Sequence, residues 1–301
     1  MRKAATLKAV GALLLITLII WAFGPALPED VQRKADLPYG RVGDQTLLLD
    51  LYLPASPIEK ALPCIIVIHG GAWRGGRKED LQFLAVRLAQ RGYAAACLSY
   101  RLAPKWTYPA QVDDVQRAVR WLRKNAGKWN IDPKRFGAVG ASAGGHLATM
   151  LGTRETRLDE PPELRGISSK VQCVVNIVGP TDLTADYYVR ASEGPLGQIL
   201  LDFLGAPFEK CPEVWRDASP YYHVSSDDAP TFMIFGSEDP LVPPDQAIRM
   251  ENYLKKCSVE TKLVIIDGMG HGPTSEEQRK AFDKALDEAL SFFDRHLKQE
   301  R

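Results

Sequence analysis

The sequence has 301 residues, with 38 lysines and arginines against 37 aspartates and glutamates, so its net charge is +1. No basic run stands out beyond the N-terminus, so no nucleic-acid partner is expected. With 45% hydrophobic and 25% charged residues the composition is that of an ordinary globular protein, and the length suits one large domain whose partner is a small molecule.

The N-terminus has a composition of its own. Three basic residues at positions 2, 3 and 8 precede an apolar stretch at residues 9–23, and prolines at positions 25 and 28 separate it from the rest of the chain. This is the pattern of a secretory signal peptide, and an uncleaved membrane anchor is the alternative. We therefore predict a leader and linker over residues 1–35, and an exported (periplasmic or extracellular) protein or one associated with the membrane through this segment.

After the leader, apolar runs of strand length alternate with amphipathic segments of helical length. Strands are predicted at residues 46–54, 64–69, 93–100, 135–141, 171–179, 231–236 and 261–268. Helices are predicted at residues 78–91, 109–126, 245–256 and 275–298, with another beginning at residue 144. Strands that are apolar throughout and alternate with helices are typical of a mostly parallel sheet covered on both faces, so the predicted fold class is α/β.

One interval, at about residues 184–230, breaks this alternation. It is long, punctuated by prolines and rich in aromatic residues. An ordinary helical excursion and a lid over a functional site are both consistent with this pattern, because long insertions in compact α/β domains often carry function.

A candidate nucleophile stands at the end of the strand at residues 135–141. Ser142 lies in the motif Gly140-x-Ser142-x-Gly144, directly before a helix. A sharp strand-to-helix turn needs small residues around the serine, and it raises the hydroxyl above the edge of the sheet. The helix N-terminus behind it offers free amides to developing negative charge. The context favours a nucleophile over a structural turn.

A serine hydroxyl needs a base, and the chain has five histidines. His296 falls in the terminal helix and His223 in the aromatic-rich interval. His146 is one helical turn beyond the serine, where packing is the expected role, and His69 belongs to a glycine turn. His271 comes after the last strand in a glycine-flanked loop, and we predict that it is the base.

The orienting acid is expected in the loop after the strand at residues 231–236. Asp239 is held there by the following proline, whereas Asp245 begins a helix. Asp267, four residues before His271, is the rival. The chain order Ser142, Asp239, His271 is the order that α/β-hydrolases use, which favours Asp239.

The glycine turn after the strand at residues 64–69 predicts an oxyanion hole. Glycine lets backbone amides approach a reacting group because it has no Cβ. We assign the donors to Gly71 and Ala72 together with the amide of Ala143, with Gly70 making room for them. Trp73 is then a wall of the substrate pocket or a packing anchor, and we predict that it contacts the substrate.

The five cysteines do not indicate a redox compartment. Cys64, Cys97 and Cys173 lie in apolar strands and are expected to be buried thiols, while Cys211 and Cys257 lie in polar segments and could pair. No spacing of cysteine and histidine indicates a metal site, and no cofactor is expected.

The chain resembles α/β-hydrolase serine esterases of the HGGxW type in five segments: "IHGGAW", "YRLAP", "GASAGGHLA", "GSEDPLVP" and "GMGHG". The resemblance is strongest to the bacterial feruloyl and acetyl-xylan esterase-like branch, which is related to hormone-sensitive-lipase-like carboxylesterases. Where lipase-like relatives have a third glycine, this chain has Ala72. The resemblance implies an α/β-hydrolase catalytic domain over residues 36–301. It also implies hydrolysis of a small-molecule or polysaccharide-linked ester through an acyl-enzyme.

Two other functions fit part of this pattern. Some proteins with the HGGxW motif are arylformamidases, which hydrolyse an amide, although an export signal speaks against cytosolic metabolism. Other α/β-hydrolase relatives bind ligands without catalysis, but these usually lose the base or the nucleophile, and here Ser142, Asp239 and His271 are all present.

Overall fold

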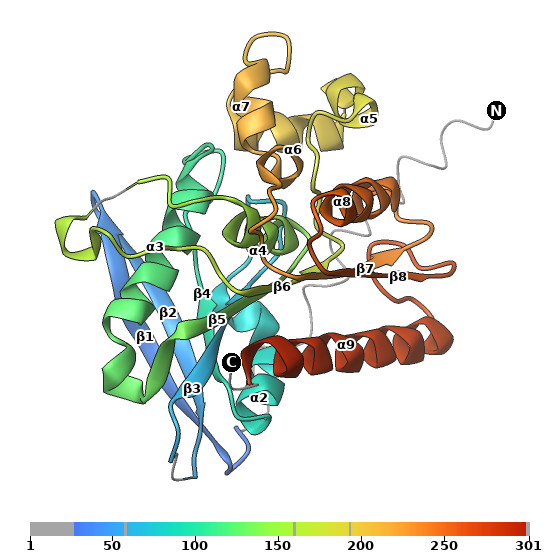
Figure 1. Ribbon diagram of the computed structural model, residues 1–301. Helices are drawn as coiled ribbons and strands as arrows, with labels where there is room; N and C mark the ends of the chain where they lie inside the picture. The colour runs from blue at the N-terminus through green and yellow to red at the C-terminus, as the bar shows by residue number, and fades with distance from the viewer. Residues whose placement is uncertain (1–26, 57–58, 159–160, 193, 299–301) are drawn as a thin grey trace.

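The computed structural model describes residues 27–56, 59–158, 161–192 and 194–298. Their centre is an eight-stranded sheet in the order β1-β2-β4-β3-β5-β6-β7-β8 (Figure 1). Antiparallel pairing joins β1 to β2 and β2 to β4, and every later pair is parallel. The strands are β1 (Val31–Val42), β2 (Gln45–Pro54), β3 (Leu62–Ile68), β4 (Ala94–Leu98), β5 (Ile131–Ala141), β6 (Cys173–Ile177), β7 (Thr231–Gly236) and β8 (Thr261–Ile266).

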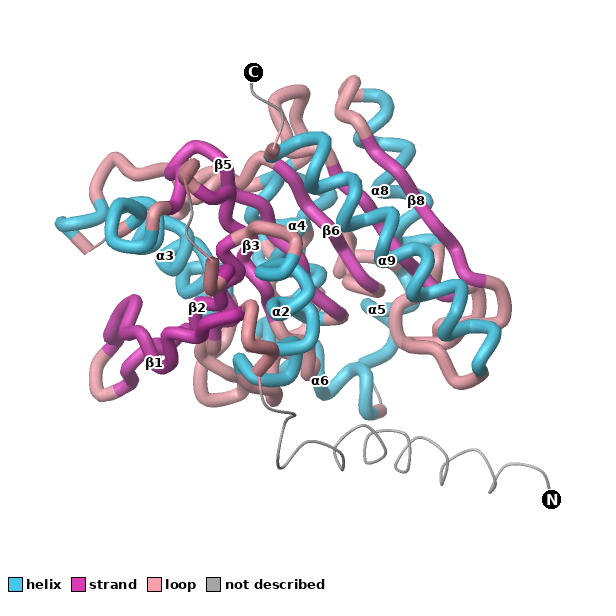
Figure 2. Tube along the Cα trace, turned by 90° about the horizontal axis from the view of Figure 1, so that it is seen from below, coloured by secondary structure: helices cyan, strands magenta, loops and turns pink. Residues whose placement is uncertain are grey.

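Helices cover both faces of this sheet, as the strands' uninterrupted apolar character predicts. Alternate residues of one strand enter different cores: Ile66 and Ile68 pack with α3 and α4, whereas Ile65 and Val67 pack with α2 and α9. Figure 2 shows α2 and α9 lying across the same face. The helices are α2 (Gln82–Gln90), α3 (Ala110–Lys124), α4 (Ala143–Thr153), α8 (Asp245–Lys256) and α9 (Glu276–Leu297), with 3-10 turns η1 (Lys78–Leu81), η2 (Ala126–Trp129) and η3 (Pro162–Leu164).

The first strand of the sheet begins before residue 36, where the start of the domain is predicted. The sheet begins at Val31, which is buried and pairs with Pro54 of β2. The segment that forms β1 contains a proline, a glycine and several charged residues, so the sequence gives no signal for a strand there. An edge strand tolerates them, since only one side of it must pair, and the register of β1 shifts at Lys34/Leu37 and at Pro38/Gly40.

The aromatic-rich interval folds into short helices that gather on one side of the sheet beyond α4 (Figure 1). We call its described part, residues 184–192 and 194–230, the cap. It contains α5 (Asp186–Val189), η4 (Arg190–Ser192), α6 (Pro195–Leu204), α7 (Pro212–Asp217) and η5 (Pro220–His223). Tyr188 of α5 donates a hydrogen bond to the carbonyl of Leu241, which lies in the loop after β7, at 3.1 Å. The cap is therefore attached to a loop at the end of the sheet.

The predicted leader at residues 9–23 lies outside the described residues. In the part of the chain that the structure does describe, none of the helices has the length and apolar character that crossing a bilayer requires.

Candidate active site

Ser142 occupies a strained turn between β5 and α4. Its backbone has φ 55° and ψ −122°, a conformation that a residue with a side chain rarely adopts. The glycines around it have no room for a Cβ: one on Gly140 would lie 2.2 Å from the carbonyl oxygen of Gly144, and one on Gly144 would lie 2.0 Å from that of Ile68. The Gly140-x-Ser142-x-Gly144 pattern is therefore a steric requirement of this turn.

The structure brings Ser142, His271 and Asp239 into one hydrogen-bonded chain. The Nε2 atom of His271 lies 2.8 Å from Ser142 Oγ, and its Nδ1 atom lies 2.6 Å from Asp239 Oδ2. A carboxylate only accepts, so Nδ1 carries the proton and Nε2 is left to accept from the serine hydroxyl. This is the arrangement that general-base activation of the serine requires.

The loop after β7 holds the carboxylate of Asp239 in place. The amides of Leu241 and Val242 donate to Asp239 Oδ1 at 2.8 and 3.0 Å, which leaves Oδ2 for the imidazole. The side chain of Asp239 is fully buried, while that of His271 is 25% exposed and open to a substrate. Asp267, the rival acid, instead accepts a long hydrogen bond of 3.5 Å from Ser237. The structure therefore brings Asp239, and not Asp267, to the base.

The predicted oxyanion loop comes after β3 and adopts left-handed backbone at three residues in succession. Their φ values are 104° at Gly71, 55° at Ala72 and 56° at Trp73. A Cβ on Gly70 would lie 2.8 Å from the carbonyl oxygen of Ala141 and 3.3 Å from the Cβ of Ser142, so the loop rests against the nucleophile turn. Across the described residues, no hydrogen bond uses the amides of Gly71, Ala72 or Ala143, and these N–H groups remain available to an oxyanion.

Comparison with known protein families agrees with this geometry. The model of the BD-FAE family matches residues 49–254, more than half of the chain. The chain belongs to the BD-FAE family. The model of the dienelactone hydrolase family also matches residues 217–297 of this BD-FAE protein.

Similar proteins include esterases. Esterase LipC of Mycobacterium tuberculosis is 32% identical over 238 residues, which are 76% of this chain and 57% of LipC. The ethyl acetate hydrolase of Pseudomonas putida is 30% identical over 244 residues, which are 79% of this chain and 74% of that enzyme. This BD-FAE chain thus spans little more than half the length of LipC and the other mycobacterial esterases it matches.

A solved structure with the same fold is that of an acetyl ester-xyloside bifunctional hydrolase from Caldicellulosiruptor lactoaceticus. Its TM-score is 0.74 at 26% identity, and the match covers 90% of this chain and 98% of that one. The predicted α/β-hydrolase fold is confirmed.

The side chain of Trp73 is packed inside the protein, and its predicted contact with substrate stays a prediction. It is buried, stacks on Phe203 of α6 with ring centroids 4.2 Å apart, and donates from Nε1 to His146 at 3.2 Å. In this BD-FAE protein these contacts fit a packing anchor, the other role considered for Trp73.

Two further histidines are buried, and each contacts a backbone carbonyl near the site. His69 stacks on Tyr100 with ring centroids 4.3 Å apart and contacts the carbonyl of Gly70 at 2.7 Å, as a turn-stabilising residue would. His146 lies between Trp73 and the carbonyl of Ala218, and burial lowers the pKa of His146 to about 4. The position of His146 in its helix predicts that it is packed in the interior. It does not predict the two polar partners, because these lie in loops that are distant in the sequence and come close only in the folded protein.

The cysteines and acidic groups of this BD-FAE protein form no further site within the described residues. All five cysteines are free thiols, with Cys64, Cys97 and Cys173 buried as predicted; Cys211 and Cys257 are not paired. Over the same residues no group of three or more potential ligands is placed to hold a metal ion.

Proposed function

We propose that this protein is a serine carboxylic-ester hydrolase that works through an acyl-enzyme. The observation that carries the proposal is the continuous hydrogen-bonded chain from Ser142 through His271 to Asp239, beside amides that make no hydrogen bond to any described residue. Esterase activity in the similar proteins, as their names state it, supports the same conclusion.

The geometry supports the following course of the reaction. Ser142 Oγ attacks the ester carbonyl carbon while its proton passes to His271 Nε2, and Asp239 stabilises the resulting imidazolium. The carbonyl oxygen becomes an oxyanion that accepts hydrogen bonds from Ala143 and from the Gly71–Ala72 loop. When the tetrahedral intermediate collapses, the alcohol leaves with the proton from Nε2. Water then attacks the acyl-enzyme by the same route and releases the acid.

The acyl group that we propose is short, with acetyl esters of small molecules or of plant polysaccharides as the substrate class. Two similar proteins support this: one is an ethyl acetate hydrolase and the other an acetyl ester-xyloside hydrolase. A feruloyl ester is the alternative within the same chemistry. An arylformamidase-like amide hydrolase and a non-catalytic binder are the alternatives outside it.

A substrate panel with the Ser142→Ala variant tests these assignments. The panel contains nitrophenyl acetate, butyrate and decanoate, acetylated xylan, methyl ferulate and N-formylkynurenine. We expect acetate and butyrate to be turned over fastest, and kcat to fall by roughly 10⁴-fold or more in Ser142→Ala. Faster hydrolysis of N-formylkynurenine than of every ester would favour the formamidase. The absence of both turnover and acylated protein, measured by intact mass, would favour the binder.

We also propose that the protein is exported. The basic residues at positions 2, 3 and 8 followed by the apolar stretch at residues 9–23 support this. N-terminal sequencing of the protein from its host distinguishes a cleaved signal from a membrane tether. An intact Met1 on protein in the cytosolic fraction would contradict both.

A further inference from the structure

The oxyanion loop holds a conformation that its sequence does not favour. Ala72 and Trp73 are not glycines, yet both have positive φ. A left-handed backbone is unfavourable for a residue with a side chain, and such a conformation persists only where the surroundings impose it. The amides that face the oxyanion therefore depend on contacts elsewhere on this loop.

The side chain of Trp73 supplies one of these contacts. The ring is 4% exposed and lies nearly parallel to that of Phe203, with an interplanar angle of 5°. Stacking restrains the ring against tilting but lets it slide. The hydrogen bond from Trp73 Nε1 to His146 Nδ1, at 3.2 Å, fixes the remaining in-plane position. His146 belongs to α4, one turn beyond Ser142, so this bond ties the oxyanion loop to the helix that carries the nucleophile.

His146 is itself fixed by a second hydrogen bond. Its Nε2 atom lies 2.6 Å from the carbonyl oxygen of Ala218, in the segment after α7 of the cap. An indole N–H only donates and a carbonyl only accepts, so Nε2 of His146 carries the proton and Nδ1 is the acceptor. Both ring nitrogens are thus used, and the ring cannot flip without breaking both bonds.

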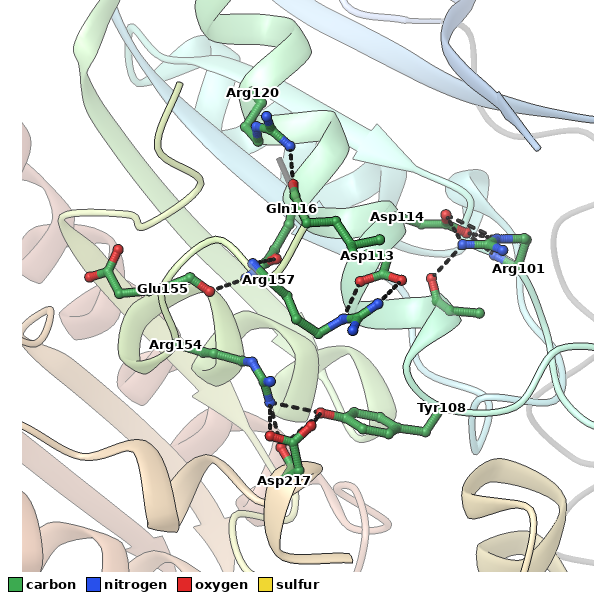
Figure 3. A network of polar contacts seen from close by, with 12 residues as sticks. Arg101, Tyr108, Asp113, Asp114, Gln116, Arg120, Arg154, Glu155, Arg157 and Asp217 are labelled. Atoms are coloured by element: carbon green, nitrogen blue, oxygen red, sulfur yellow. Dashed lines mark hydrogen bonds and ion pairs between the residues drawn. The ribbon is translucent and has the colours of Figure 1, made fainter. Parts of the chain in front are cut away.

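The segment that holds His146 is clamped to the far end of the same helix. Arg154, which comes directly after α4, forms an ion pair with Asp217 at 2.6 Å and donates to its backbone carbonyl at 2.8 Å. Tyr108 donates to the same carbonyl at 2.8 Å, and Figure 3 shows these three side chains converging. Asp217, the residue before Ala218, is therefore fixed at the far end of α4, which makes the Ala218 carbonyl a firm support for the imidazole.

We propose that His146 is a positioning residue for the oxyanion hole: by accepting from Trp73 Nε1 while donating to the Ala218 carbonyl, it sets the Gly71–Ala72 amides relative to Ser142. The inference rests on the proposed ester hydrolysis. It adds a residue to that mechanism which touches neither the substrate nor the reacting atoms.

The variant Trp73→Phe tests this most directly, because it keeps an aromatic ring that can stack on Phe203 and removes the N–H donor together with part of the indole. Trp215→Phe is a matched control. Trp215 is also buried, at 3% exposure, and its Nε1 donates to the carbonyl of Ala206 at 3.0 Å, so it loses the same kind of bond within the cap. Both variants should lose similar stability, as measured by urea unfolding. Loss of an oxyanion donor lowers kcat by about 10²–10³-fold, so displacement of the loop in Trp73→Phe should lower kcat by roughly 10-fold with KM little changed.

Binding of a trifluoromethyl ketone, which forms a tetrahedral adduct with the serine, gives a second measurement. Its affinity should weaken in Trp73→Phe by the same factor as kcat/KM, because both report stabilisation of the oxyanion. His146→Asn retains an acceptor near the position of Nδ1, whereas His146→Leu retains none. We expect His146→Asn to keep more activity than His146→Leu, and the double variant Trp73→Phe/His146→Leu to be no worse than His146→Leu alone.

Equal kcat and equal inhibitor affinity in Trp73→Phe and Trp215→Phe would overturn the inference, whether or not the His146 variants fold. Failure of the proposed function gives a different result, since the wild-type protein would then hydrolyse no ester in the panel. In that case the rate at which a fluorophosphonate labels Ser142 replaces kcat. Slower labelling of Trp73→Phe than of wild type would still support the inference, and equal rates would refute it.

Discussion

The variant Asp239→Asn should inactivate the site by reversing the tautomer of His271. The amides of Leu241 and Val242 donate to Asp239 Oδ1, so the asparagine carbonyl must take that position and its NH₂ group must face the imidazole. Nδ1 would then have to accept, and the ring proton would move to Nε2, where it faces Ser142 Oγ. A base that already carries its proton cannot activate the serine. The equivalent change in serine proteases lowers kcat by about 10⁴-fold, or roughly 5.5 kcal/mol, and we expect a similar loss here.

Initial rates with nitrophenyl acetate at neutral pH measure this effect, and circular dichroism confirms that the variant is folded. Asp267→Asn is the control, because the Asp267 carboxylate contacts Ser237 at 3.5 Å and not the imidazole. It should retain roughly wild-type kcat. A folded Asp239→Asn protein that keeps more than about a tenth of wild-type kcat would refute the tautomer argument. A larger loss in Asp267→Asn than in Asp239→Asn would move the acid to Asp267.

Two further predictions concern stability. Gly144→Ala places a Cβ 2.0 Å from the carbonyl oxygen of Ile68 and should lower the free energy of unfolding by about 3 kcal/mol or more. Gly127→Ala is the control and should be neutral or slightly stabilising, because its Cβ would have no atom of the described residues within 4 Å. Similar urea midpoints for the two variants would contradict the steric argument. Burial lowers the pKa of His146 from 6.5 to about 4, so between pH 6.5 and about 4 the unfolded chain binds a proton that the folded protein does not. The free energy of unfolding should therefore fall by about 3 kcal/mol between pH 6.5 and 4, and a pH dependence that is unchanged in His146→Asn would exclude this cause.

Much of the fold can be predicted because its signals are local. The helix predicted at residues 245–256 has the bounds of α8, since apolar residues recur at helical spacing between a proline-rich start and Cys257. The α/β class is indicated by strands that are apolar on both faces. Ser142 is recognisable for a related reason: the glycines that its turn requires are close to it in the sequence.

The features that the sequence does not reveal depend on contacts between distant segments. The strand β1 has no periodic apolar signal, because it is an edge strand and its charged residues serve a buried cluster: Arg33 pairs with the fully buried Asp50 at 2.6 Å. The role of Trp73 is ambiguous in the sequence for a similar reason. Its partners Phe203 and His146 are 130 and 73 residues away, and whether the ring faces them or the substrate depends on the φ angles of a single loop.

The order of strands explains why Ser142 and His271, 129 residues apart, come within 2.8 Å of one another. β5, which precedes the serine, and β8, which precedes the histidine, are separated by β6 and β7, so their ends are about 14 Å apart at the usual spacing of strands. The loop after β8 must therefore run back across the end of β7. Gly236 makes this possible, because a Cβ there would lie 2.1 Å from the carbonyl of Met269. That carbonyl then accepts from the amide of Glu238 at 3.0 Å, which joins the loop of the acid to the loop of the base. Gly236 at the end of β7 is thus as necessary for bringing Ser142 and His271 together as the glycines that flank the serine.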